Sequence, residues 1–338
     1  MTPRALALVA AASLALCGAS LADVQPVPDT MLAAALDKGG GPEVLTIHHL
    51  PVPPIKADEV LIAVHAAGVG AWEAGMRRQP SARARFPLVL GSDVAGTIAA
   101  VGSAVRGFSV GDQVYGTGNG TYAEYVAARA QNIAHLPKGI TPTEAGALAI
   151  SGLSALQGID DALHLKAGET LIVHGAAGAV GTLAVQLARL RGARVLATAS
   201  DEAGLALAQR LGAEAVVNGR TGDIAAAAHV FAPNGVDAVL GLAGGDALEH
   251  CIDALRRDGR GRVAYLYGME PLPKPRFAIS MILYSFYTGT EQLARLNQAV
   301  EAAKLHVPVV EVPLAAAADA HRRLEAGHVP GKIVLVVR

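Results

Sequence analysis

A short glycine-rich segment near the middle of the chain constrains the fold more than any other feature. Residues 174–181 read His-Gly-Ala-Ala-Gly-Ala-Val-Gly and follow the strand-like run Thr170–Val173. Apolar residues then recur at helical spacing from Val180 to Ala188, so one face of the following helix is hydrophobic. A strand, a glycine turn and a helix in this order predict a βαβ unit that binds a dinucleotide, and a purely structural glycine turn is the alternative.

The expected cofactor contacts lie in this turn and in the first turn of the helix. Its three glycines allow a tight turn, close approach of the backbone to a pyrophosphate, and close packing of helix on strand. The helix N-terminus adds unpaired N–H groups that attract a phosphate. The residues expected to bind the cofactor here are Gly175, Ala177, Gly178, Ala179, Val180 and Gly181.

The patterns on either side of the turn predict two domains in a chain of 338 residues. Residues 31–150 contain short β-rich runs separated by glycine and proline, which are typical of a compact β-barrel-like lobe. Residues 151–283 alternate strand-like and helical stretches, as in a parallel sheet covered on both faces. Residues 284–338 are expected to return to the first lobe. The elements expected in this tail are a helix at Thr290–Lys304, a strand at Val307–Val312, a helix at Ala317–Ala326 and a strand at Lys332–Val337.

Charge and cysteine content narrow the ligand. Lys plus Arg, 28 in number, nearly balance 29 Asp plus Glu, so no broad field favours nucleic acid or an anionic membrane as a partner. Two cysteines exclude a disulfide framework, an iron–sulfur site and a four-cysteine zinc lobe. The expected ligand is therefore a small molecule, and no stable membrane span is expected.

The N-terminal segment predicts export. Residues 1–22 read as a signal peptide, with Arg4 before an apolar stretch and Ser20-Leu21-Ala22 as a small-x-small cleavage site. Residues 23–30 then form a linker, and the mature protein is exported to the periplasm. Two alternatives stay open: a cytoplasmic protein that starts at Met31, and an uncleaved N-terminal anchor.

Taken together, the motifs resemble the medium-chain dehydrogenase/reductase superfamily across residues 31–338. Within it, they are most similar to the zinc-independent, zeta-crystallin-like quinone oxidoreductases. This resemblance implies a GroES-like β-barrel catalytic domain, a Rossmann domain with a doubly wound parallel sheet, and a homodimer. It also implies NADPH-dependent reduction of quinones or α,β-unsaturated carbonyls. Besides the glycine turn, the segments that carry the resemblance are Pro87–Gly96, Val110–Val114, Gly120–Val126, Ser151–Gln157, Arg210–Ala213 and Gly331–Leu335.

The same resemblance argues against a bound metal. Zinc alcohol dehydrogenases carry a cysteine after a strand end, a Gly-His-Glu turn and a four-cysteine lobe. The corresponding stretches here read Gly68-Val-Gly-Ala-Trp-Glu73 and Gly91-Ser-Asp93, without thiolate or imidazole. We therefore expect a metal-independent enzyme.

The resemblance also suggests residues around the reacting groups. Ser154 matches a position near the nicotinamide, with a helix cap as the alternative. Tyr122 would hydrogen-bond a substrate carbonyl, although strand packing is favoured for it. Lys332, in the shared segment Gly331–Leu335, is expected to contact the cofactor.

Gly70, Trp72 and Glu73 match the segment that lines the substrate cleft of the family. Trp72 would stack on a flat substrate or belong to the core. Glu73 would orient the substrate or bond neighbouring backbone, and the structural role is favoured. Gly70 stands where an asparagine is usual, so polarisation of the substrate by that amide is lost.

The end of the second strand of the Rossmann domain favours NADPH over NADH. An NAD-specific site commonly places an acidic residue there, but this chain has Ala199 followed by Ser200. Ser200 and Arg220 are expected to bind the 2′-phosphate. Asp201 and Glu202 add negative charge nearby, so the preference is modest. Two rival functions remain, namely a nucleotide-binding sensor or crystallin-like protein without turnover, and an alcohol dehydrogenase.

Overall fold

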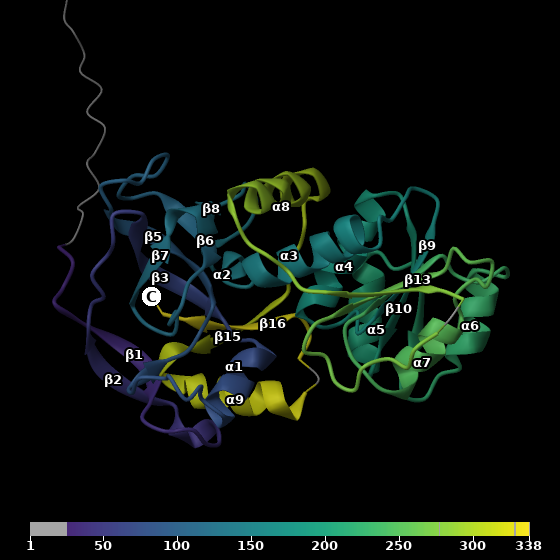
Figure 1. Ribbon diagram of the computed structural model, residues 1–338, viewed down its shortest axis with the longest axis horizontal. Helices are drawn as coiled ribbons and strands as arrows, with labels where there is room; N and C mark the ends of the chain where they lie inside the picture. The colour runs from purple at the N-terminus through teal and green to yellow at the C-terminus, as the bar shows by residue number, and fades with distance from the viewer. Residues whose placement is uncertain (1–25, 277, 328, 338) are drawn as a thin grey trace, which may run out of the picture.

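The structure is a computed structural model that describes residues 26–276, 278–327 and 329–337, and it forms two lobes (Figure 1). The expected signal peptide, residues 1–22, lies outside the described residues, as do residues 23–25 of the expected linker. Among the described residues, no helix is long and apolar enough to cross a bilayer.

The second lobe contains the glycine turn, and we call it the nucleotide lobe after the predicted dinucleotide site. It is built on a six-stranded parallel sheet with the order β11-β10-β9-β12-β13-β14. Leu171 and Val173 of β9 point to one face of this sheet and Ile172 to the other, because successive residues of a strand alternate. Helices α3, α4, α5 and α8 cover the first face, and α6 and α7 cover the second. This is a doubly wound sheet. Its strands are β9 (Thr170–His174), β10 (Arg194–Ala199), β11 (Ala215–Asn218), β12 (Ala238–Gly241), β13 (Arg262–Leu266) and β14 (Ser280–Tyr284), and its helices are α3 (Ala149–Gln157), α4 (Ala179–Leu190), α5 (Glu202–Leu211), α6 (Ile224–Phe231), α7 (Asp246–Asp253) and α8 (Thr290–Ala303).

The first lobe is a curved, mostly antiparallel assembly around a second hydrophobic core. Its seven-stranded sheet has the order β15-β16-β3-β5-β6-β8, with β7 paired to β3, and β2-β1-β4 form a small sheet beside it. The strands are β1 (Thr30–Leu36), β2 (Thr46–Pro51), β3 (Glu59–Gly68), β4 (Leu88–Val89), β5 (Asp93–Val101), β6 (Gln113–Thr117), β7 (Tyr125–Arg129), β8 (Ile133–His135), β15 (Val309–Pro313) and β16 (Lys332–Val336), and the helices are α1 (Ala71–Arg78), α2 (Pro142–Ala145) and α9 (Ala317–Ala326). With the doubly wound sheet, this lobe confirms the predicted fold class.

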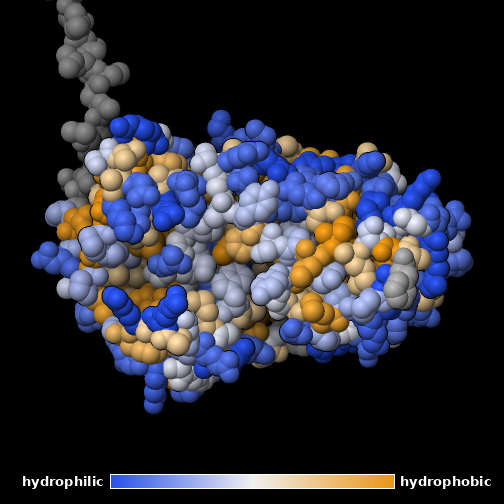
Figure 2. All heavy atoms as spheres, viewed as in Figure 1, coloured by the Kyte–Doolittle hydropathy of each residue, from blue (hydrophilic) through white to orange (hydrophobic). Residues whose placement is uncertain are grey.

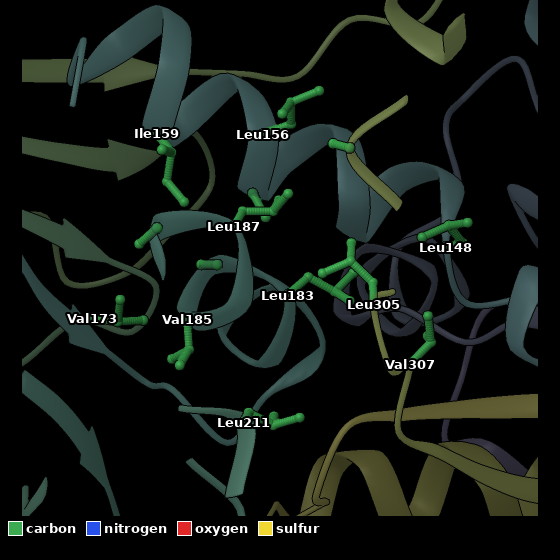
Figure 3. Packing of buried hydrophobic residues seen from close by; sticks show 14 of the residues in the cluster. Leu148, Leu156, Ile159, Val173, Leu183, Val185, Leu187, Leu211, Leu305 and Val307 are labelled. Atoms are coloured by element: carbon green, nitrogen blue, oxygen red, sulfur yellow. The ribbon is translucent and has the colours of Figure 1, made fainter. Parts of the chain in front are cut away.

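The tail is divided between the lobes. Helix α8 packs on α3 and α4, whereas β15 and β16 extend the sheet of the first lobe and α9 packs on α1. Figure 3 shows Leu156 of α3 close to Leu187 of α4, and Leu305, from the segment after α8, next to Leu183. Val307 of the same segment belongs to this cluster of buried residues. The joint between the lobes is thus a packed apolar core, which holds the two halves of any site between them in fixed positions.

Several elements are absent from the sequence expectations, among them β1, α1 and β14. The run Met31–Leu36 is alanine-rich and lacks alternation, yet it forms β1 because it pairs with both β2 and β4 and buries residues on both faces. Strand β1 begins at Thr30, the last residue of the expected linker. Helix α1 is only eight residues long, and β14 is the edge strand of its sheet, so neither gives a strong periodic signal.

Candidate active site

The glycine turn joins β9 to α4 at the centre of the parallel sheet. Gly175 has a φ of +83°, a left-handed conformation that glycine adopts without strain. A Cβ on Gly181 would lie 2.2 Å from the carbonyl oxygen of Gly175, so the helix can approach the strand only with glycine there. Gly178 is the N-cap of α4, and no side chain caps this helix within the described residues. The N–H groups of the first turn are therefore available to an anionic ligand.

A cavity of about 480 Å³ opens beside this turn. Its wall includes two segments that are distant in sequence from the turn, namely the end of β10 with Ser200 and the loop after β11 with Arg220. The structure thus brings the predicted residues of the turn and of the phosphate pocket to one cavity. The predicted residues that line it are Gly175, Ala177, Gly178, Ser200 and Arg220, while Ala179, Val180 and Gly181 form the adjoining first turn of α4.

Two charged residues at this cavity, Asp201 after β10 and Arg220 after β11, make local hydrogen bonds. The Asp201 side chain caps α5 by accepting a hydrogen bond of 2.8 Å from the N–H of Gly204. Arg220 is exposed, and its backbone N–H donates to Oδ1 of Asn218 over 2.9 Å. Asp201 and Arg220 both line the cavity, so a carboxylate and a guanidinium face the same ligand space.

A second cavity, of about 340 Å³, lies in the first lobe next to α3 and the segment after β14. We call it the cleft. Its walls combine two aromatic rings, Trp72 and Phe286, with small polar side chains. Thr288 contributes a buried hydroxyl oxygen that makes no hydrogen bond among the described residues. The residues lining the cleft are Trp72, Ser92, Thr117, Gly118, Asn119, Asn132, Ile150, Phe286 and Thr288.

Trp72 and Glu73 lie next to each other in the first turn of α1 but have different surroundings. The Trp72 ring is 41% exposed and its Nε1–H donates to Oγ of Ser92 over 3.2 Å. Glu73 is fully buried, and its Oε2 accepts a hydrogen bond of 2.8 Å from the N–H of Gly70. Burial raises the pKa of Glu73 from 4.5 to about 7, although the charge of Lys332 opposes the shift.

A buried ion pair lies close to Trp72 and Glu73. Lys332 and Asp93 are almost fully buried, and the ammonium contacts Oδ2 of Asp93 directly. The other oxygen, Oδ1, accepts the N–H of Ile150 at the start of α3 over 2.8 Å. The Lys332 ammonium also lies 5.2 Å from the centre of the Trp72 ring. Lys332, predicted as a cofactor contact, is thus held on the side of the molecule that carries the cleft.

Ser154 and Tyr122 do not line either cavity in the described part of the chain. Ser154 is buried in the interior of α3, not at its cap, and its carbonyl accepts a hydrogen bond from the Tyr284 hydroxyl. Tyr122 is fully buried and packs edge-on against the ring of His321. Burial raises the pKa of Tyr122 well above its ordinary value. The packing role, which the sequence favoured for Tyr122, agrees with this position.

Comparison with known proteins assigns the family. The family model of the alcohol dehydrogenase GroES-like domain matches residues 56–138, and that of the zinc-binding dehydrogenases matches residues 211–335. A quinone oxidoreductase of Mus musculus is 34% identical over 324 residues, which cover 91% of this chain and 98% of the mouse protein. The chain belongs to the quinone oxidoreductase family of the medium-chain dehydrogenase/reductase superfamily.

Other relatives point to the same cofactor and reaction class. An NADPH-dependent alkenal/one oxidoreductase from the chloroplast of Arabidopsis thaliana is 33% identical, with coverage of 91% of this chain and 80% of that protein. The crystal structure of the Escherichia coli quinone oxidoreductase complexed with NADPH superimposes with a TM-score of 0.80 at 25% identity, over 91% of this chain and 100% of the other. The quinone oxidoreductase fold therefore extends over both lobes described here.

Several residues at these cavities have no counterpart among the sequence predictions. His174 is the last residue of β9 and lines the cavity beside the glycine turn, which we call the cofactor cavity. A hydrogen bond of 2.7 Å joins its Nδ1 to Oγ1 of Thr198. Burial lowers the pKa of His174 to about 4, so its ring is neutral at physiological pH. Ser92 and Asp93 stand in a motif that carried the family resemblance, which was the one available signal. Phe286 and Thr288 follow an edge strand, and only the folded chain brings them to the cleft.

Proposed function

We propose that this quinone oxidoreductase family member reduces a quinone or an α,β-unsaturated carbonyl with NADPH. The observation that carries the proposal is the pairing of a glycine-turn cavity with a second cleft that is walled by two aromatic rings. Such a cleft accepts a flat conjugated ring between apolar faces, while its polar rim receives the oxygen atoms.

The residues at the first cavity fit a dinucleotide. Gly175 and Gly178 line the cavity without side chains, which leaves room for a pyrophosphate beside the N–H groups of α4, and Gly181 lets α4 approach β9 closely. Ser200 and Arg220 would hold a 2′-phosphate at the far end. Bound NADPH supplies a hydride to an electron-poor carbon, and the protein supplies position.

The cleft fits the second reactant. Trp72 and Phe286 would pack on the faces of a ring, and the side-chain amides of Asn119 and Asn132 would donate hydrogen bonds to its oxygens. The free hydroxyl of Thr288 is a further donor. These are neutral donors, which suit an uncharged quinone or enone better than a carboxylate or phosphate ester.

We further propose that the reaction needs no zinc. The stretches Gly68–Glu73 and Gly91–Asp93 correspond to segments that carry ligands in zinc dehydrogenases, and Asp93 already pairs with the Lys332 ammonium. A fixed ammonium in contact with that carboxylate would repel a divalent cation. Metal analysis of the purified protein tests this proposal, and one tightly held zinc per chain would overturn it.

The decisive experiment follows NADPH absorbance with a panel of quinones, enals and enones. We expect NADPH to be oxidised by at least one flat quinone or enone. In the reverse direction, we expect no reduction of NADP⁺ by simple alcohols. A protein that binds NADPH but oxidises it with no member of the panel would favour the sensor or crystallin-like role. Turnover of alcohols alone would favour the alcohol dehydrogenase.

A homodimer is proposed from the edge of the nucleotide sheet. β14 is the edge strand in the described sheet, and it exposes Leu283 beside the exposed Tyr267 and Tyr287. Figure 2 shows hydrophobic residues gathered in the middle of the nucleotide lobe on an otherwise largely hydrophilic face. Pairing of two copies would cover such an edge. Light scattering at micromolar concentration tests it, and a monomer would contradict it.

We also propose that the protein is exported. The support is the arrangement of Arg4, the apolar stretch and the Ser20-Leu21-Ala22 site in the sequence. Mass spectrometry of the native N-terminus is the test. A mature start at Asp23 is expected, whereas a start at Met31 would indicate a cytoplasmic protein and retention of Met1 an anchor or extension.

A further inference from the structure

The proposed reaction needs a proton, and no acidic group among the described residues lines the cleft. Two-electron reduction of a quinone by hydride leaves an oxygen anion, which becomes a hydroxyl only when a proton is delivered. The described side chains that line the cleft include no carboxyl, imidazole or ammonium group. The proton must therefore come from water or from a group behind the lining.

Glu73 is such a group. Its side chain is fully buried, and Oε2 accepts the N–H of Gly70 over 2.8 Å. Its Oε1 is buried and has no hydrogen-bond partner in the described part of the chain. An ionised carboxylate with one oxygen buried and unpaired is costly, because nothing replaces the lost water. The carboxyl therefore holds its proton more readily than an exposed one.

Ser92 connects Glu73 with the cleft. It lines the cleft, and its side chain interacts with that of Glu73. Its Oγ accepts the indole N–H of Trp72 over 3.2 Å. Because this oxygen accepts the hydrogen bond from Trp72, the Ser92 hydroxyl proton is not used on the indole and can be directed to Glu73 or to a substrate oxygen.

We propose that Ser92 donates a proton to the substrate oxygen and that Glu73 replenishes it. In this step the Ser92 O–H bond breaks as an O–H bond forms on the substrate. The Glu73 O–H bond then breaks to restore the Ser92 hydroxyl, and once the product has left, water in the cleft returns a proton to the Glu73 carboxylate through Ser92. The hydride of NADPH supplies both electrons. Ser92 is the catalytic residue and Glu73 a positioning residue, and the inference rests on the proposed function.

The charges around Glu73 set the pH range of this route. The groups that face it are the Lys332 ammonium, which favours ionisation, the Asp93 carboxylate, which opposes it, and the hydroxyls of Ser92 and Tyr122. Burial outweighs Lys332 and brings the pKa of Glu73 to about 7. The acid form is therefore present below neutral pH, and the proton source is lost as pH rises above it.

The test uses Glu73→Gln, Ser92→Ala and a matched control, Glu124→Gln. Glu124 is partly buried and, like Glu73, accepts a backbone N–H, that of Leu32 over 2.8 Å, but it does not line either cavity. Two readouts are needed. Infrared difference titration of the cofactor-free protein follows the carboxyl of Glu73 directly, and kcat/KM for NADPH with 1,4-naphthoquinone is followed from pH 5.5 to 9.

In the wild type we expect a carboxyl signal that titrates near pH 7 and a matching fall of kcat/KM above that pH. Glu73→Gln removes both the signal and the fall, and it lowers kcat at least tenfold at pH 6. Ser92→Ala keeps the infrared titration, displaced to higher pH, yet lowers kcat by about 100-fold, within the range of general-acid effects. Glu124→Gln changes none of these.

The outcomes separate this inference from the proposed function. If the wild type reduces no quinone or enone, the function itself fails. If it reduces 1,4-naphthoquinone but Ser92→Ala is unchanged in kcat, or if no carboxyl titrates near neutral pH, the proton route alone is wrong. Should Glu73→Gln fail to fold, Ser92→Ala and the wild-type titration still decide.

Discussion

The indole ring of Trp72 occupies the space where a side chain on Gly70 would lie. A Cβ on Gly70 would come within 2.5 Å of Cη2 of the ring. The backbone of Gly70 is extended, with φ −119° and ψ 161°, so the conformation itself would admit an asparagine. The two positions are therefore coupled: glycine at 70 is the partner that tryptophan at 72 requires.

This coupling predicts a non-additive pair of substitutions. Gly70→Asn should displace the indole and break its hydrogen bond to Ser92, so it should destabilise the protein and raise KM for 1,4-naphthoquinone. The same change in a Trp72→Ala background should cost less, with an interaction free energy of about 1 kcal/mol or more. Urea unfolding of all four proteins measures it. Gly75→Asn is the control, because a Cβ on Gly75 would meet no other atom within 4 Å. Additive effects of the Gly70 and Trp72 substitutions would contradict the coupling, because they would show that the indole and the backbone adjust without cost.

Gly178→Asp should separate cofactor binding from folding. A Cβ on Gly178 would meet only the Gly175 carbonyl, at the ordinary distance of 3.5 Å. Aspartate also suits the N-cap of α4, so the free energy of unfolding should not fall. Its charge, however, would face the pyrophosphate. We expect the Kd for NADPH to rise at least tenfold above that of the uncharged Gly178→Asn variant, as measured by calorimetry. Equal affinity in the two variants would show that the pyrophosphate of NADPH does not bind at the N-terminus of α4.

Arg220 should set the preference for NADPH over NADH. Arg220 is the one arginine or lysine among the described residues that line the cofactor cavity, which Asp201 also lines. We expect a preference of about tenfold in kcat/KM, which corresponds to about 1.4 kcal/mol and to one charge-assisted contact. Arg220→Ala should reduce it by weakening NADPH alone. Arg85→Ala, in the other lobe, should not change the ratio, and equal efficiency with NADH in the wild type would assign control to the acidic residues instead.

Glu73 should make stability depend on pH. Its pKa is raised from 4.5 to about 7 by burial, so the native state binds a proton that the unfolded state releases. The stabilisation from this proton is complete below pH 4.5 and is lost as pH rises through about 7. Relative to Glu73→Gln, the free energy of unfolding of the wild type should fall by on the order of 3 kcal/mol as the pH rises through this range. Urea unfolding at pH 5, 6, 7 and 8 measures the difference, and parallel curves for the two proteins would refute the buried acid.

The nucleotide lobe shows how much local sequence determines. Thr170–His174, the glycine turn and the helix after it were predicted because each depends on contacts within about four residues or on backbone freedom at a single glycine. The tail helix at Ala317–Ala326 was predicted for the same reason. By contrast, the alanine-rich residues of β1 have weak local preference, and pairing with two distant strands decides their conformation.

The cofactor cavity and the cleft also combine features that the sequence determines with features that only tertiary contacts determine. Sequence alone determined the glycine turn, the missing acidic residue at Ala199 and the absence of the zinc ligands, since each is a matter of which residue occupies a known motif. The tertiary structure decided that Lys332 pairs with Asp93 across 239 positions, that Ser92 meets Trp72, and that Tyr122 is sealed in the core. These features arise where β16, β5, α1 and α3 converge, and burial and charge at such a junction depend on segments that no local pattern connects.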